Sequence, residues 1–186
     1  LVDAGADKDK ANNEGVTPMF IASQNGHLEI VRLLVEAGTD LDHWDNYGHT
    51  PLYFASQYGH LEVVRLLVKA GADLDEAGHE GGQSATTPLV IACEKGHLEV
   101  VRLLVDAGAD MDQWDKGDNT PLSIASEEGH YEIVRLLLDA GADLDNDVGS
   151  PLENARRCHH DDIVEMLQRA RAGATRYPKQ KNTLMN

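Results

Sequence analysis

Histidine recurs at one position of a repeated pattern, and imidazole is a common metal ligand. Intervals of 33, 37, 33 and 30 residues separate five of these histidines: His27, His60, His97, His130 and His160. On equivalent helices of a stack, neighbouring histidines would lie roughly 8 to 10 Å apart. Two imidazoles that share one zinc ion, each bound at about 2.0 to 2.1 Å, can be separated by only about 4 Å. The series therefore predicts a structural role, and we expect no metal site.

Other chemistry-bearing residues lack the spacing that their chemistry needs. The Cys, His, His and Asp at 158–161 are consecutive, and consecutive helical residues point in different directions. The acidic run 143–154 resembles a calcium loop, but its Gly is seventh instead of sixth, and Asn replaces the Glu at the twelfth position. The glycines at 78–82 precede no P-loop lysine, and no nucleophile elbow, zinc-protease or kinase signature is present. We expect no enzyme activity and no cofactor.

A Thr-Pro pair and a Gly-His pair recur together along the chain. The first series is Thr17-Pro18, Thr50-Pro51, Thr87-Pro88 and Thr120-Pro121, with Ser150-Pro151 as a variant. The second series is Gly26-His27, Gly59-His60, Gly96-His97 and Gly129-His130. Both series shift together, and the first uses five of the six prolines, so they mark one internal repeat.

Each repeat predicts two helices. Thr before Pro places a hydroxyl at the N-cap and a residue without an amide hydrogen at the first helical position. The Gly about eight residues later suits a left-handed helix end. The next segment, HLEIVRLLVEAG and its copies HLEVVRLLVKAG, HLEVVRLLVDAG and HYEIVRLLLDAG, has apolar residues at helical spacing and ends on Gly. Helices this short are marginal alone, so neighbouring units must stack to stabilise one another.

The segments TPMFIA, TPLYFA, TPLVIA and TPLSIA, each followed by Gly-His, an apolar helix and Gly-Ala-Asp or Gly-Thr-Asp, resemble the ankyrin repeat. The resemblance implies an all-α repeat solenoid with a hairpin, two antiparallel helices and a loop in each unit, and it implies protein binding without catalysis. The family's His after Thr-Pro-Leu is replaced in every unit: Phe20, Tyr53, Val90, Ser123 and Glu153. The family's hairpin Asn is also replaced: Asp42, Asp75, Asp112 and Asp145. These aspartates make the hairpins unusually acidic.

The repeats define one array and a tail. Within the array 1–172 we expect a truncated repeat end at 1–11 and full repeats at 12–44, 45–77, 82–114, 115–147 and 148–172. The first full repeat should expose an apolar face, and the polar fifth repeat, in which Asn154 takes an apolar slot, predicts a C-terminal cap. The third hairpin should have a longer, flexible tip, and the fourth should be short. Residues 173–186 are basic and aperiodic, so we expect a disordered tail.

Length and charge exclude several classes of protein. The 186 residues are 41% hydrophobic and 5% aromatic, which predicts a folded domain with a core of Leu, Val, Ile and Ala. A net charge of −16 repels phosphate backbones and anionic lipid headgroups, so we expect neither nucleic-acid nor membrane binding. Two cysteines, no apolar run of about 20 residues and no signal peptide predict reduced thiols in an intracellular protein. We expect a cytoplasmic monomer, with the nucleus as the alternative compartment.

Aromatic residues at exposed positions provide the candidate site. Trp44 and Tyr47 fall in a predicted hairpin, Tyr58 ends a first helix, and Trp114 takes the hairpin slot equivalent to Trp44, whereas Phe54 takes a core slot. Hairpin tips and first helices form the usual ligand surface of the ankyrin family. Because Trp and Tyr are enriched at binding hot spots, we predict a partner contact here. The predicted site also includes three polar residues: Asn46, His49 and Gln57.

Protein binding is the main functional hypothesis. We expect a scaffold that binds a basic or amphipathic protein through hairpin tips and first helices, because the acidic repeats attract opposite charge. The alternatives are a regulatory or targeting segment of a larger enzyme, ubiquitin-ligase adaptor or channel, and a structural spacer that binds nothing. On the second helices, Glu and Arg three residues apart, such as Glu29 and Arg32, predict a solvated face.

Overall fold

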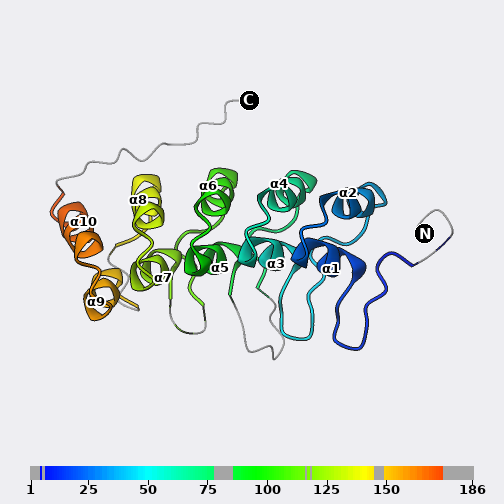
Figure 1. The fold of residues 1–186 in the computed structure, drawn as a ribbon, viewed down its shortest axis with the longest axis horizontal. Coiled ribbons are helices and arrows are strands. Elements are labelled where there is room, and N and C mark those ends of the chain that lie inside the picture. Colours follow the sequence, from blue (N-terminus) through cyan, green and yellow to red (C-terminus); the bar gives the residue numbers. More distant parts are fainter. Residues whose placement is uncertain are drawn as a thin grey trace.

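The computed structural model describes residues 5, 7–77, 86–115, 117, 119–144 and 149–173, and these form ten helices and no strand. The helices are α1 (Pro18–Gln24), α2 (Leu28–Glu36), α3 (Pro51–Gln57), α4 (Leu61–Ala70), α5 (Pro88–Lys95), α6 (Leu98–Ala107), α7 (Pro121–Glu127), α8 (Tyr131–Ala140), α9 (Pro151–Arg157) and α10 (Asp161–Arg171). The helices contact one another as five consecutive pairs. Figure 1 shows the odd-numbered helices in one row and the even-numbered helices in a second row. The predicted all-α repeat solenoid is confirmed.

The Thr-Pro pairs begin the first helix of each pair, as the sequence predicts. Thr50 is buried at the N-cap of α3, and its Oγ1 accepts a hydrogen bond from the backbone N–H of Tyr53 at 3.1 Å. Equivalent bonds begin the other first helices: Phe20 to Thr17, Val90 to Thr87, Ser123 to Thr120 and Glu153 to Ser150. The first residue of a helix has no intrahelical partner for its amide hydrogen, so Pro, which lacks this hydrogen, loses no hydrogen bond there.

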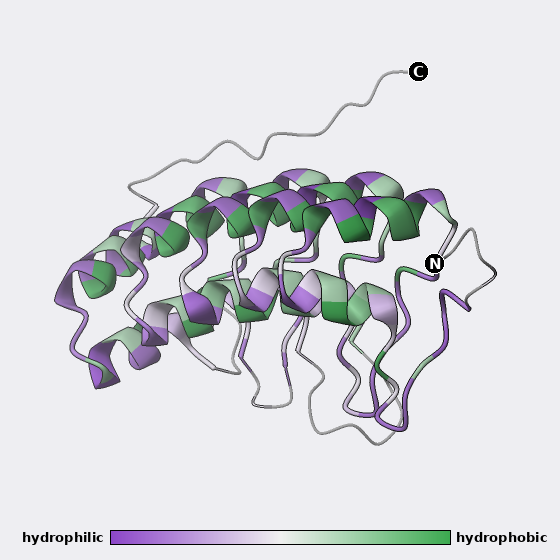
Figure 2. Cartoon of the chain, turned by 45° about the vertical axis from the view of Figure 1, so that its right-hand side comes forward, coloured by the Kyte–Doolittle hydropathy of each residue, from purple (hydrophilic) through white to green (hydrophobic). Residues whose placement is uncertain are grey.

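The second helix of each pair is amphipathic, and Figure 2 shows hydrophilic and hydrophobic residues interspersed along it. Its solvent side carries exposed ion pairs three residues apart, such as Glu62 Oε2 with Arg65 Nε at 3.4 Å. Each such pair contributes about 0.2 to 0.5 kcal/mol. Three of these helices end on a left-handed glycine with φ of 93 to 97°: Gly71, Gly108 and Gly141.

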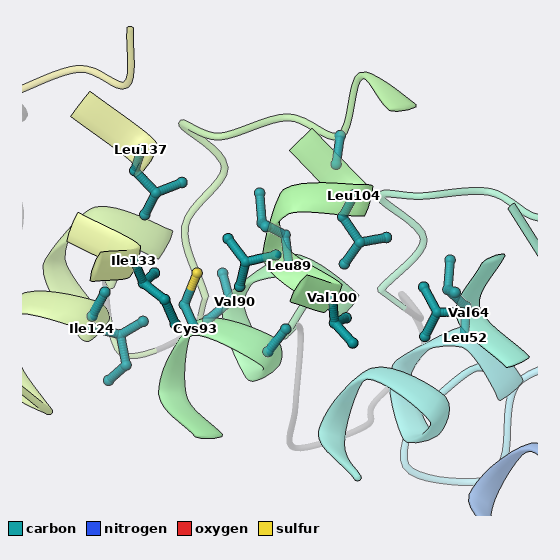
Figure 3. Packing of buried hydrophobic residues seen from close by; sticks show 14 of the residues in the cluster. Leu52, Val64, Leu89, Val90, Cys93, Val100, Leu104, Ile124, Ile133 and Leu137 are labelled. Carbon is teal, nitrogen blue, oxygen red and sulfur yellow. The ribbon is translucent and has the colours of Figure 1, made fainter. Parts of the chain in front are cut away.

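One continuous apolar core fills the space between the two rows of helices. Figure 3 shows its central part, where Leu89 and Cys93 of α5 lie between Leu104 of α6 and Ile133 of α8. All four side chains are buried. Burial also raises the pKa of the Cys93 thiol, so this cysteine packs as a small apolar group. Each helix contacts its partner and the equivalent helix of the next pair, which fixes the stack.

The fifth pair gives the array a polar C-terminal side. Asp161 and Gln168 of α10 are exposed, whereas Leu61 and Val68, at the equivalent positions of α4, pack against the core. His159 replaces the helix-ending glycine and has a φ of 62°. A Cβ at the equivalent Gly129 would lie 2.5 Å from the ring of His160 in the next pair. No described pair follows α10, so no such ring opposes the His159 side chain.

Several sequence predictions concern residues outside the described part of the chain. They are the flexible third hairpin tip at 78–85, the short fourth hairpin around 145–148, most of the basic tail at 174–186, and the first four residues of the truncated repeat. Among the described helices, none is long and apolar enough to cross a membrane.

Candidate protein-binding surface

The loop between the first two helix pairs is built around a buried carboxylate. Asp45 is 5% exposed, and its Oδ1 accepts the backbone N–H groups of Tyr47 and His49, both at 2.9 Å. Its Oδ2 lies 3.2 Å from Nδ1 of the His49 ring. The backbone N–H of Asp45 in turn donates to the carbonyl of His49 at 3.0 Å. These four bonds fix the loop that displays Trp44 and Tyr47.

Seven aromatic side chains form a continuous strip over this loop, α1, α3 and the start of α4: Phe20, Tyr47, His49, Tyr53, Phe54, Tyr58 and His60. The Phe20 and Phe54 rings lie 4.5 Å apart, and the His49 ring stacks on Tyr53 at the same distance. Phe54 also contacts His49, Tyr53 and Tyr58, with ring centroids 5.2 to 6.2 Å apart. Phe54, which was predicted to take a core slot, is only half-buried there, and its ring joins the strip.

The aromatic strip contains both buried and exposed rings. Phe20 and Tyr53 are buried, and burial, with Glu94 and Asp45 nearby, raises the pKa of Tyr53 to about 12. Tyr47 and Tyr58 are 58% and 51% exposed. Each exposed ring is reached from His49 by ring contacts, Tyr47 directly at 6.2 Å and Tyr58 through Phe54. The strip thus holds two accessible tyrosines on a fixed aromatic base.

Both tryptophans of the predicted site lie on hairpins and are accessible. Trp44 is 42% exposed and precedes the Asp45 anchor, and Trp114 is 54% exposed and precedes Asp115. Asp115 repeats the anchor: its Oδ1 accepts the backbone N–H groups of Gly117 and Asn119 at 2.8 and 2.9 Å. Trp114 lies two repeats away from Trp44 and does not join the aromatic strip.

The polar residues of the predicted site are engaged within the molecule. The backbone N–H of Asn46 donates to the Glu14 carbonyl at 2.9 Å, and its side chain donates to the Asn13 carbonyl at 3.0 Å. These bonds join two successive hairpins. His49 is held by Asp45. Gln57 contributes its backbone carbonyl, which accepts a hydrogen bond from His97 at 3.0 Å, whereas its buried side-chain Oε1 has no hydrogen-bond partner in the described residues. Asn46 and His49 therefore support the surface that the aromatic residues expose.

The sequence also matches a family model described as ankyrin repeats (3 copies), over residues 1–78 and 74–148. The chain belongs to the ankyrin-repeat family. Ankyrin repeats are generally protein–protein interaction modules and typically act as non-enzymatic scaffolds. A search of curated proteins found no match.

In this ankyrin array the repeated histidines connect neighbouring repeats. His60 Nε2 lies 3.0 Å from the carbonyl of Gln24, at the end of the preceding first helix, so the ring N–H donates. The same bond recurs three times: His97 to Gln57, His130 to Glu94 and His160 to Glu127. Within the described residues, no group of three or more metal-ligating side chains occurs.

Aspartates connect the ankyrin hairpins in the same way. Asp42 Oδ1 accepts the backbone N–H of Asp73 at 2.9 Å, and Asp75 accepts that of Asp110 at the same distance. Asp112 continues the series to Asp143 at 2.8 Å. Burial raises the pKa of Asp42 and Asp75, and the neighbouring aspartate charges add to this shift. We call Asp42, Asp75 and Asp112 the acidic ladder. These aspartates make the hydrogen bond between hairpins but bring negative charges close together.

Sequence reasoning missed the residues that hold the surface in place. Asn12, Asp45 and Asp115 occupy one slot, and each side chain accepts backbone N–H groups two and four residues later. The sequence signal that could have identified these three residues is an Asn or Asp at the first position of a repeat, because these side chains favour such turns. The buried members of the aromatic strip, Phe20 and Tyr53, were identified only as replacements for the family's histidine.

Proposed function

We propose that this ankyrin array binds a basic or amphipathic segment of another protein across its hairpin tips and first helices. The observation that carries the proposal is the pair of exposed rings, Tyr47 and Tyr58, held within one aromatic strip. Trp44, exposed on the same hairpin as Tyr47, extends the apolar area. Trp114 provides a second contact two repeats away. Tyr and Trp are the residue types most enriched at hot spots.

The rigidity of the strip favours binding. Buried Phe20 and Tyr53 support the exposed rings, and the Asp45 carboxylate holds the hairpin backbone at Tyr47 and His49. Side chains that are already ordered lose little conformational entropy when a partner binds. Each exposed Tyr also offers both an apolar ring and a hydroxyl at the surface.

Charge indicates the chemistry of the partner. Residues 1–155 carry 29 acidic and 9 basic residues. The charges of Glu94 and Asp45 act on the buried Tyr53 hydroxyl within the strip. A Lys or Arg side chain placed over an exposed Tyr face would gain a cation–π contact. The acidic surface attracts a basic partner and accelerates their encounter, and it repels acidic partners.

A displayed library of random linear peptides, selected against the chain, tests the proposal. We expect the selected peptides to combine Lys or Arg with apolar residues. The double variant Trp44→Ala/Tyr47→Ala should lose about 2 kcal/mol or more in binding, roughly 30-fold in Kd, without a marked change in melting temperature. Tyr131→Ala removes an exposed ring from α8, on the second row, and is the matched control that should bind normally.

Two results would contradict this function. If selected peptides bind the double variant as tightly as they bind the original chain, Trp44 and Tyr47 do not belong to the binding site. A double variant that melts early but still binds would show that Trp44 and Tyr47 stabilise the hairpin only. Enrichment of acidic peptides would contradict the charge argument separately.

A further inference from the structure

The surface that carries Tyr58 changes in chemistry along the row of first helices. Three exposed residues end α3, α5 and α7 at equivalent positions: Tyr58, Lys95 and Glu128. Three half-buried residues precede them: Gln57, Glu94 and Glu127. We call these six residues, together with Phe54, the first-helix face. From α3 to α7 this face is first aromatic and then charged.

Three carboxylates lie in the middle of the first-helix face. Lys95 Nζ lies 2.5 Å from Oε1 of Glu94, and Arg157 Nη2 lies 2.9 Å from Oε1 of Glu127. Both of these ion pairs are partly exposed. Within the described part of the chain, no ion pair engages the exposed carboxylate of Glu128. A cationic side chain from another segment can therefore bind Glu128 without breaking an existing pair.

The first-helix face is continuous along the row. Consecutive first helices contact one another, and Figure 1 shows them side by side. Glu94 of α5 lies close enough to Tyr53 of α3 to help raise the pKa of that hydroxyl. Glu127 of α7 reaches Arg157 of α9. An extended segment that follows the row from α9 to α3 therefore meets carboxylates first and exposed aromatic rings last.

The C-terminal segment has the matching order of chemistry. Residues 174–186 (ATRYPKQKNTLMN), which we call the tail, follow α10 and lie outside the described part of the chain. They include no acidic residue and three basic residues: Arg176, Lys179 and Lys181. An apolar pair, Leu184 and Met185, comes after the basic residues. Starting from α10, the tail is thus basic first and apolar last.

The end of α10 has the backbone geometry that leads to a first helix elsewhere in the array. Ala172 and Gly173 have φ angles of −70° and 71°, and Ala37 and Gly38 after α2 have φ angles of −76° and 70°. After Gly38 the chain continues through a hairpin to the first helix α3. The same turn at Gly173 therefore faces the side of the array from which a first helix is reached.

The tail also has the length that the first-helix face requires. Packed helices lie roughly 8 to 10 Å apart, so α7, α5 and α3, two, three and four helix steps from α10, lie within roughly 20, 30 and 40 Å of it. An extended chain spans about 3.3 to 3.6 Å per residue. From Gly173, Lys179 can therefore reach about 20 Å, Lys181 about 26 Å and Leu184 about 36 Å. These spans match α7, α5 and α3 in turn.

We propose that residues 174–186 lie extended along the first-helix face of the same molecule. Lys179 and Lys181 then meet the glutamates of α7 and α5, and Leu184 covers the exposed ring of Tyr58. This inference rests on the proposed function, because the tail has the chemistry expected of the partner and competes with it for the aromatic strip. A partner must displace the tail, so the tail lowers the apparent affinity of the site.

A spin label on the tail tests the contact directly. The variant Cys158→Ser/Met185→Cys places one accessible thiol on the tail, because the other cysteine, Cys93, is fully buried. At low salt, we expect a nitroxide at position 185 to broaden the amide NMR signals of Phe54 and Tyr58 in α3. An undocked tail would instead broaden mainly the signals near its attachment to α10. Added NaCl should reduce the broadening of α3, because it screens the attraction between the lysines and the glutamates.

Charge reversal on the tail tests the competition. The variant Lys179→Glu/Lys181→Glu should abolish the broadening of α3 and bind the selected peptides about 5-fold more tightly than the original chain, because the site is no longer occupied. Any added negative charge also attracts a basic peptide, so a matched control is needed. Arg65→Glu/Lys69→Glu makes the same change of charge at exposed positions of α4, in the second row, and should give a clearly smaller gain.

Three results would overturn the proposal. The first is broadening that is strongest around α10 and absent from α3. The second is broadening of α3 in a mixture of spin-labelled molecules with unmodified, isotope-labelled molecules, which would show that the tail binds a second copy. The third is an equal gain in affinity from the two charge variants, which would assign the effect to overall charge.

The proposed function can fail separately from this inference. If α3 is broadened by the label but no selected peptide binds the aromatic strip, the tail docks on a face that is not a partner site. If peptides bind the strip but the label leaves α3 unaffected, the partner site stands and the tail does not occupy it.

Discussion

At the residue scale, the hairpin aspartates combine a favourable hydrogen bond with an unfavourable charge. Asp42 and Asp75 each accept a backbone N–H from the next repeat, but burial raises the pKa of both. The folded state therefore disfavours their ionised form. Asn keeps the accepting oxygen without the charge. We expect Asp42→Asn and Asp75→Asn each to raise the melting temperature at pH 7 by about 1 to 3 °C.

The pH dependence of this gain follows from the direction of the shift. Because the folded pKa lies above the ordinary value of 3.8, the charge penalty is absent below that value and complete above the folded pKa. The Asn variants should therefore gain stability at pH 7 and lose the gain in acid. Asp9→Asn is the control, since a hydrogen bond from Lys8 lowers the pKa of Asp9. A gain at pH 7 from Asp9→Asn as well would contradict the burial argument.

The repeated histidines allow a second comparison between equivalent residues. His97→Ala removes the donor to the Gln57 carbonyl and leaves that acceptor unpaired inside the stack. An unsatisfied buried group costs about 1 to 3 kcal/mol, so denaturant unfolding should show a loss of this size. His27→Ala removes the same side chain where no preceding pair is described, and it should cost less than about 0.5 kcal/mol. Equal losses would mean that the ring stabilises its own helix pair instead.

Sequence reasoning at this scale found the exposed aromatic residues but not their support. Trp44, Tyr47 and Tyr58 could be placed at the surface because a turn or a helix end rarely buries its side chains. Phe54 could not be placed correctly, since the same slot buries Ile91 to 3% exposure. The Phe54 ring instead extends to contact Tyr58. Such a contact between side chains four residues apart depends on ring size as well as on helical spacing.

At the element scale, the first helices depend on their N-caps because each has only seven or eight residues. Thr50→Ala removes the oxygen that accepts the Tyr53 N–H, and we expect a loss of about 1 kcal/mol in the free energy of unfolding. Thr39→Ala is the matched control. Thr39 is also buried, but its Oγ1 has no hydrogen-bond partner in the described residues.

Urea unfolding of the two variants measures the cap directly, because both substitutions delete the same atoms from a buried site. If Thr39→Ala is as destabilising as Thr50→Ala, packing and not capping explains the effect.

The helix boundaries themselves were predictable from the sequence, since Thr-Pro and Gly act locally at the two ends of a helix. The hairpin anchors were not, because an Asp within a polar stretch does not reveal which backbone N–H groups it will accept.

At the scale of the whole molecule, negative charge is repeated from one ankyrin repeat to the next. Residues 1–155 have a net charge of −20 and residues 156–186 a net charge of +4. Stacking repeats brings each ladder aspartate next to another, as Asp42 next to Asp73 and Asp75 next to Asp110. The opposing attractions are weak, since the Glu–Arg pairs on the second helices are exposed. Repulsion should therefore dominate the salt dependence of stability.

We expect the melting temperature to rise as NaCl increases from low to moderate concentration. The Debye length falls from about 30 Å at 0.01 M to about 10 Å at 0.1 M, so repulsion between neighbouring repeats becomes progressively screened. Thermal melts at constant pH measure the slope. The triple variant Asp42→Asn/Asp75→Asn/Asp112→Asn should have a smaller slope and melt higher at low salt. A flat or falling melting temperature in the original chain would show that exposed ion pairs outweigh the ladder, and an unchanged slope in the variant would place the repulsion elsewhere.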